Sequence, residues 1–209
     1  MAFMQWRGAR SRLALAGMLV GLSGIAGIAS GCGKEPERVD PNIEIFADFA
    51  KRVDAYVALR NNLADSVGPL DPKMSQNDIA SRSTKLATAI IAARQGAKPG
   101  DIFTPEAASI IATLIKQEYD RRPPRILEAR GDAQEELKEE HPDFEPQVNQ
   151  IYPTGAPLAT FPASMLPLLP QLPKEIEYRI VRTWLILRDI EANVIVDIMP
   201  HAVPQEKLP

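Results

Sequence analysis

Residue types that enzymes commonly use at their sites are scarce in this chain of 209 residues. It contains one cysteine, Cys32, and two histidines, His141 and His201. A single cysteine cannot form an intramolecular disulfide, and neither histidine has a neighbour at the spacing of a metal-binding motif. The chain after Cys32 also has no nucleophile-elbow, phosphate-loop or dinucleotide-binding glycine pattern. We therefore expect neither a metal nor a cofactor.

Positive charge is also limited. Lys and Arg number 24 while Asp and Glu number 27, which gives a formal net charge of −3. Three of the arginines lie near the N-terminus, before residue 13, so a chain without its leader would be more acidic still. A surface of this sign repels nucleic acid, and the sequence contains no basic stripe. A nucleic-acid partner is therefore not expected.

The N-terminal stretch has the three parts of an export signal. Its arginines are followed by the uncharged run Leu13–Ser30 and then by small residues directly before Cys32. A charged region, an apolar region and a small-residue cleavage site define a signal peptide, which we assign to residues 1–31. Because the only thiol follows this site, we predict that Cys32 carries a diacylglycerol, as in bacterial lipoproteins. The membrane would then be a partner through the acylated cysteine.

Two alternatives to the lipoprotein interpretation stay open. Ala29 stands where such signals more often have leucine, and an ordinary secretory cut after Ala29 or Gly31 would release a soluble secreted or periplasmic protein. The other alternative is an uncleaved membrane anchor, because a helix needs about 17–25 apolar residues to span a bilayer and the uncharged run has 18. Four glycines in this run weaken such a helix. A lipoprotein would instead be anchored on the outer side of the cytoplasmic membrane, or at the outer membrane of a host with two membranes.

The chain after the signal begins with a short tether and a helical body. Residues 32–39 are charged and contain glycine and proline, which is typical of a tether. Residues 40–140 contain three amphipathic patterns bounded by caps and stops. The expected helices run from Asp40 to Gly68, from Ser75 to Gly96 and from Thr104 to Pro123. Arg60 interrupts the apolar series of the first helix, and a fourth, weaker helix is expected over Arg125–Glu140.

Proline then changes the pattern. Ten of the 19 prolines fall between Pro123 and Pro173, which argues against long helices and central strands there. The same region is rich in apolar residues that a disordered linker would lack. We therefore predict an ordered, extended wrap over residues 141–174 that packs across the helical body, with one short helical turn near Ala163–Leu168.

Residues 175–209 are predicted to form a three-stranded antiparallel β-meander and a tail that pack on the same core. Alternating and β-branched residues mark strands within Glu175–Met199, and Arg182-Thr183 and Ala192-Asn193 fit two-residue hairpin loops. The resulting fold class is α+β, with helices before strands.

The loops also fix the pairing of the strands. They place two rows across the sheet: Tyr178, Leu187 and Ile198 toward the core, and Glu177, Arg188 and Asp197 on the opposite face. Asp189 falls on the core face beside the second loop. We expect its carboxylate to accept hydrogen bonds from amides of the turn over residues 191–193.

Three acids around the last hairpin are the remaining candidates for chemistry: Asp189, Glu191 and Asp197. Paired carboxylates can catalyse hydrolysis, but acids at a turn more often form salt bridges and cap amides. Two hypotheses follow. The protein is either a non-enzymatic envelope lipoprotein, which binds another envelope protein or has a structural role in organising the envelope, or a carboxylate-based hydrolase or metal-dependent enzyme. Converging acids in a cleft would favour the enzyme, and salt-bridged acids would favour the binding protein.

Several stretches together resemble a group of bacterial secreted proteins and lipoproteins that has no assigned activity. The stretches are Asn42–Phe46, Gly100–Glu106, Glu177–Arg179, Leu185–Asp189 and Asn193–Asp197. The resemblance would cover most of the chain after the signal, and its motifs are structural. It implies export and carries over no catalytic residue.

Overall fold

The computed structural model describes residues 41–121, 136–157 and 161–203. The chain divides into the units Met1–Glu37 and Arg38–Pro209, and all the described residues belong to the second. The signal peptide, Cys32 and the tether therefore lie outside the described residues. The second unit has the predicted α+β organisation, with helices that precede a three-stranded antiparallel sheet.

The three long helices lie where the sequence places them: α1 (Pro41–Val67), α2 (Gln76–Ala93) and α3 (Pro105–Asp120). Ser75 and Asp78 form a capping box at the start of α2, and Thr104 caps α3 by accepting the N–H of Ala107. Gly68 follows α1 with φ +102°, a conformation that favours glycine. Residues 136–140 are helical, and the rest of the expected fourth helix lies outside the described residues.

The sheet has the order β1-β2-β3, with β1 (Ile176–Val181), β2 (Trp184–Asp189) and β3 (Ile195–Met199). Its first hairpin has the predicted two-residue loop. The predicted register is also confirmed there, because Glu177 pairs with Arg188 and Tyr178 pairs with Leu187.

The second hairpin differs from the prediction. Leu187 pairs with Asp197 instead of Ile198, and β3 contains an extra residue, Val196, between two ladder pairs. The carbonyl of Val196 accepts a hydrogen bond from Nη2 of Arg94 (2.9 Å), which satisfies the main chain at this bulge. Both predicted rows are consequently wrong in their third strand. Ile198 packs on the face away from the main core, and Asp197 lies on the same face as Leu187.

The turn before β3 is longer than predicted. The N–H of Asp189 donates to the carbonyl of Val194 (2.9 Å) and closes a turn over residues 190–193, where the sequence suggested only Ala192 and Asn193. Asn193 adopts φ +55°, which asparagine tolerates better than most residues. A longer turn and a bulge together account for the shift in register.

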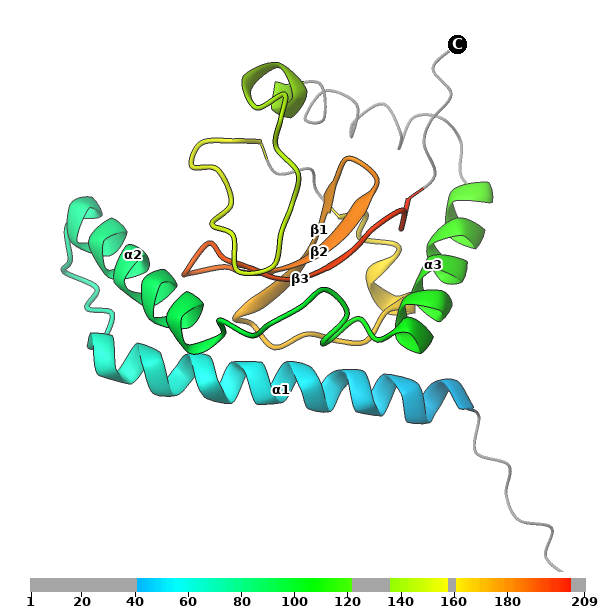
Figure 1. Cartoon of the computed structure of the whole chain (residues 1–209), viewed down its shortest axis with the longest axis horizontal. Helices are drawn as coiled ribbons and strands as arrows, with labels where there is room; N and C mark the ends of the chain where they lie inside the picture. Colours follow the sequence, from blue (N-terminus) through cyan, green and yellow to red (C-terminus); the bar gives the residue numbers. More distant parts are fainter. Residues whose placement is uncertain (1–40, 122–135, 158–160, 204–209) are drawn as a thin grey trace, which may run out of the picture. The chain divides into compact units, whose positions relative to one another are not determined.

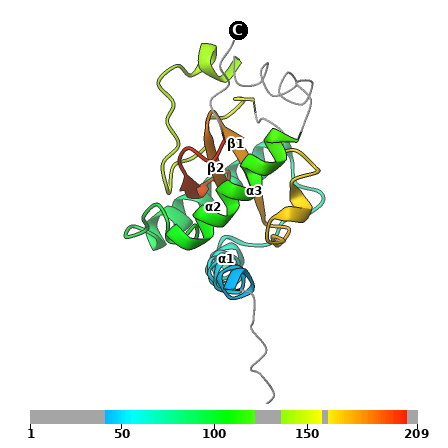
Figure 2. The same cartoon turned by 90° about the vertical axis from the view of Figure 1, so that its right-hand side faces the viewer.

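Two apolar clusters cover the two faces of the sheet. The main core joins the three helices to the near face and includes Phe49, Val53, Leu86, Ile90, Ile111, Ile115, Ile180, Leu185 and Leu187. Figures 1 and 2 show α1 below the sheet, and Figure 1 places α2 and α3 toward its two ends. The far face carries the second cluster: Leu137, Phe144, Tyr152, Ala156, Val181, Ile186, Ile195 and Ile198.

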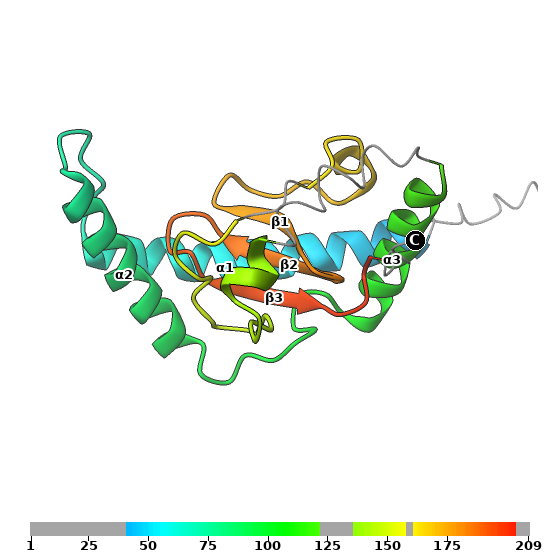
Figure 3. The same cartoon turned by 90° about the horizontal axis from the view of Figure 1, so that it is seen from above.

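The proline-rich wrap is divided between these clusters. Residues 136–157 cross the far face of the sheet, as Figure 3 shows from above, and Ile151 forms an isolated bridge with Val194. Phe161, Met165 and Leu169 instead enter the main core. The short helical turn expected near residues 163–168 is present as η1 (Leu166–Leu168). Among the described residues of the wrap, the first half therefore covers the sheet instead of the helices, and the second half joins the main core as predicted.

Candidate functional site

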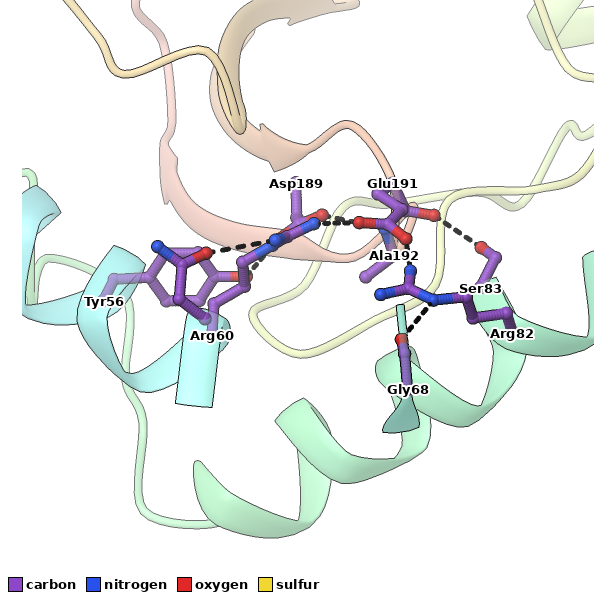
Figure 4. Close-up of polar contacts among 9 residues, drawn as sticks. Tyr56, Arg60, Gly68, Arg82, Ser83, Asp189, Glu191 and Ala192 are labelled. Atoms are coloured by element: carbon purple, nitrogen blue, oxygen red, sulfur yellow. Dashed lines mark hydrogen bonds and ion pairs between the residues drawn. The ribbon is translucent and has the colours of Figure 1, made fainter. Parts of the chain in front are cut away.

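Asp189 lies at the end of β2 and is completely buried. Its carboxylate accepts hydrogen bonds from the hydroxyl of Tyr56 (2.9 Å), Nε of Arg60 (3.2 Å) and the N–H of Ala192 (2.8 Å) (Figure 4). The predicted bond to a turn amide is confirmed. Arg60, the charged residue on the apolar side of α1, is thus the cation that the buried acid requires.

Glu191 lies in the same turn between two arginines. Its carboxylate contacts Nη2 of Arg60 and Nη1 of Arg82 (Figure 4). Arg82 also donates through Nε to the carbonyl of Gly68 (2.8 Å), and the hydroxyl of Ser83 donates to the Glu191 carbonyl. These contacts connect the end of α1, the first turns of α2 and the β2–β3 turn.

The charges of this cluster balance. Two carboxylates, Asp189 and Glu191, face two guanidinium groups, Arg60 and Arg82, whose exposed fractions are only 8% and 9%. Burial raises the pKa of Tyr56, and the charge and hydrogen bond of Asp189 raise it further, so its hydroxyl stays protonated and donates. Every carboxylate of the cluster therefore has a fixed donor, which is the arrangement of a structural ion-pair network.

Asp197 occupies a separate site beneath the α2–α3 loop. Its Oδ1 accepts the N–H groups of Gly100 (2.9 Å) and Ile198 (2.8 Å), and its Oδ2 accepts those of Ile102 and Phe103 (both 2.7 Å). Burial raises the pKa of Asp197, although the four N–H groups favour its ionised form. The carboxylate holds the loop against β3. It does not join the predicted row with Arg188.

Arg188 has other partners on the far face of the sheet. It contacts the carboxylate of Glu177, as predicted, and donates through Nε to Oδ1 of Asn193 (2.7 Å). Its guanidinium also lies over the ring of Tyr152, 5.9 Å from the ring centre. These contacts attach residue 152 of the wrap to the central strand.

Sequence reasoning missed most of the basic partners. Arg60 was visible as a break in an apolar series and Arg94 as a basic residue at a helix end, but no pattern marked Arg82 or pointed to the contacts of Arg94. Arg94 lies 5.0 Å from the ring centre of Tyr56 and donates to Oδ1 of Asn149 (3.0 Å). Such contacts join distant segments, and one sequence carries no local signal for them.

Two cavities are bordered by residues other than the three predicted acids. One of about 580 Å³ runs beside β1 and is bordered by Tyr178 and Leu166. The other, of about 440 Å³, lies at the start of α2 and is bordered by Asp71, Lys73 and Arg82. Neither of these two cavities is lined by any of the three predicted acids, although Arg82, which borders the second, contacts Glu191.

Within residues 41–121, 136–157 and 161–203, no group of three or more His, Cys, Asp or Glu side chains is arranged to hold a metal. No helix of this described part is both long and apolar enough to cross a bilayer. No model of a protein family, no curated protein and no solved structure matches the chain. The resemblance to bacterial secreted proteins and lipoproteins therefore stays a prediction.

Proposed function

We propose that this protein is a non-enzymatic binding protein of the bacterial cell envelope, tethered through a lipid on Cys32. The observation that carries the proposal is the engagement of all three candidate acids. Asp189 and Glu191 face arginines, and Asp197 accepts four main-chain N–H groups. Carboxylates held in this way act as structural acceptors, so binding is the function that the geometry supports best.

The tether follows from the leader and from the position of α1. Eight residues separate Cys32 from Pro41, where the helix begins. Fully extended, they reach at most about 28 Å. A lipid on Cys32 would therefore keep the folded unit close to the bilayer, where membrane-proximal envelope proteins are the partners within reach. Stable attachment needs at least two acyl chains, which a diacylglycerol supplies.

The alternative of a carboxylate-based hydrolase or metal-dependent enzyme has no comparable support. Such an enzyme needs two acids that converge on an accessible space, with one able to exchange a proton. Asp189 and Glu191 share Arg60 and do not line either cavity. No observation on the described residues favours this alternative, and we do not propose it.

The test is cross-linking in native membranes, followed by purification of the tagged full-length chain under denaturing conditions. We expect the same envelope protein to be recovered in repeated experiments. Its recovery should fall with Cys32→Ser, which removes the acyl acceptor while leaving the folded unit unchanged. Equal recovery with wild type and Cys32→Ser would contradict a role for the tether. Failure to recover any specific protein would contradict the binding function.

A further inference from the structure

The outer edge of β1 has unpaired main-chain groups. The N–H of Ile190 donates to the carbonyl of Glu175 (2.9 Å), in line with the register of the first hairpin. Because residues of an antiparallel strand alternate between facing the partner strand and facing away, Ile176 and Tyr178 direct their main-chain groups outward. The N–H of Ile176 bonds the carbonyl of Pro173 (3.1 Å). In the described part of the chain, this leaves the Ile176 carbonyl and both main-chain groups of Tyr178 open.

A groove, which we name the β1 groove, follows this edge. Its β1 wall consists of the four consecutive residues Ile176–Arg179, and its volume is about 580 Å³. Successive side chains of a strand point to opposite faces, so a groove lined by four in a row runs along the edge. The side chains of Ile176 and Tyr178 enter the main core, and the Tyr178 hydroxyl donates to the carbonyl of Pro170 on the opposite wall (3.0 Å).

The opposite wall explains why the edge is open. It comprises Phe161, Leu166, Pro167, Pro170, Gln171 and Leu172. Proline has no N–H to donate, so this segment cannot pair with β1 as a neighbouring strand. Leu166 is 48% exposed, which leaves an apolar side chain available beside the open edge.

Arg179 is the cationic residue that lines the β1 groove. Its Nη2 donates to Oε2 of Glu177 (2.6 Å), which also lines the groove and is contacted by Arg188 as well. Nε of Arg179 is buried without a hydrogen-bond partner, and no contact among the described residues engages its Nη1. A carboxylate would supply the acceptor that this guanidinium lacks.

We infer that the β1 groove binds an extended, apolar peptide segment of a partner protein that also carries an acidic side chain. The segment adds to the edge of β1 through main-chain hydrogen bonds, packs on Leu166 and places its carboxylate at Arg179. Ile180 already has another contact, so pairing is centred on Tyr178. This inference rests on the proposed function only in taking the partner to be a protein.

The test uses full-length protein in lipid nanodiscs and a fluorescent peptide of about nine residues, with alternating valine and threonine around one glutamate. Fluorescence anisotropy should show saturable binding. Main-chain N-methylation at alternate residues of the peptide should weaken binding about tenfold, because it removes hydrogen-bond donors without removing side chains. Replacement of the glutamate by lysine should also weaken binding, and Arg179→Gln should abolish that difference.

Two surface variants provide the matched comparison in the protein. Leu166→Glu should weaken peptide binding about tenfold by putting a charge into the groove. Ile43→Glu, at a residue that is 62% exposed and outside the groove, should leave affinity unchanged. Circular dichroism of both variants would verify that they fold.

Four outcomes would overturn the inference. The first two are no binding of the peptide and equal binding of its N-methylated form. The third is displacement of the unmethylated peptide by dodecanoate, which would indicate a site for amphiphiles. The fourth is self-association that Leu166→Glu abolishes, which would indicate that a second copy of the chain occupies the groove. Partners recovered equally from wild type and Leu166→Glu membranes would refute the groove while leaving the proposed function intact. Peptide binding without any recovered partner would refute the proposed function alone.

Discussion

Arg60 and Asp189 are 129 positions apart in the sequence and form a buried ion pair, with 3.2 Å between Nε and Oδ2. Each residue is anomalous in its own element, since Arg60 lies on the apolar side of α1 and Asp189 on the core face of β2. A buried charge is tolerated when it is paired and hydrogen-bonded. The two anomalies therefore explain each other, and they connect α1 to the central strand.

Removal of one partner should leave the other charge buried without compensation. We expect Arg60→Met to lower the free energy of unfolding by about 3–5 kcal/mol. The double variant Arg60→Met, Asp189→Asn should cost less than the sum of its single variants, because it removes both charges. Lys116→Met is the control, since its pair with Asp120 is well exposed, and it should cost less than about 1 kcal/mol. If urea melts show that the double variant loses as much unfolding free energy as the two single variants together, the two residues are not coupled.

Asp197 should be difficult to replace even by its own amide. In Asp197→Asn, one oxygen that accepts two N–H groups becomes an NH₂ group that faces those donors. We expect a loss of about 2–5 kcal/mol in the free energy of unfolding and faster hydrogen exchange at Ile102 and Phe103. Asp71→Asn, which alters an exposed acceptor of a single N–H from Lys73, is the control. Equal stability of the two variants would show that Asp197 does not hold the loop.

The two faces of the sheet can be compared through adjacent residues of β2. Leu187→Ala should cost about 2–5 kcal/mol, the usual range for a buried leucine. For Arg188→Ala the sequence predicts less than about 1 kcal/mol, as for an exposed ion pair. The side chain is only 13% exposed and bonds Glu177 and Asn193, so we now expect about 1–3 kcal/mol. A larger loss for Arg188→Ala than for Leu187→Ala in parallel urea melts would contradict the packing.

Stability should depend on pH through Glu177. Burial opposes its ionisation, but hydrogen bonds and charges from Arg179 and Arg188 outweigh burial and hold the pKa of Glu177 below its ordinary value of 4.5. The folded state therefore binds fewer protons here than the unfolded state, so this stabilisation is full above 4.5 and is lost as pH falls through the folded pKa. The stability difference between wild type and Glu177→Gln should shrink in acid. A difference that does not change with pH in urea melts would contradict this.

Features that depend on neighbouring residues could be predicted from the sequence, and features that depend on contacts between distant residues could not. Caps and stops such as Ser75 and Gly68 act locally, so the three helices and their ends were predictable. The first hairpin was predictable because a two-residue loop fixes its register. The carbonyl at the Val196 bulge is bonded by Arg94, a residue about a hundred positions away, and the four donors of Asp197 come mostly from another loop. Neither the bulge nor the contacts of Asp197 could be predicted from the alternation of apolar and polar residues along the strand.

The candidate site shows the same division. The bond from Asp189 to a turn amide follows from local turn chemistry, and it was predicted. The pairing of Glu191 with Arg60 and Arg82 requires the packing of both α1 and α2 against the turn. Arg60 gave a partial clue as a misplaced charge, whereas Arg82 gave none. The sequence therefore named the acids but not the cations that decide their role.

The central claim is attachment through Cys32, and the intact mass of the protein purified from native bacterial membranes tests it most directly. We predict a chain that begins at Cys32 and carries the added mass of a diacylglycerol, with or without a further acyl chain. Cys32→Ser should give only unprocessed chain, which retains residues 1–31 and has no lipid mass. A wild-type chain that begins at Cys32 or Ser30 without lipid, or one that retains residues 1–31, would contradict attachment.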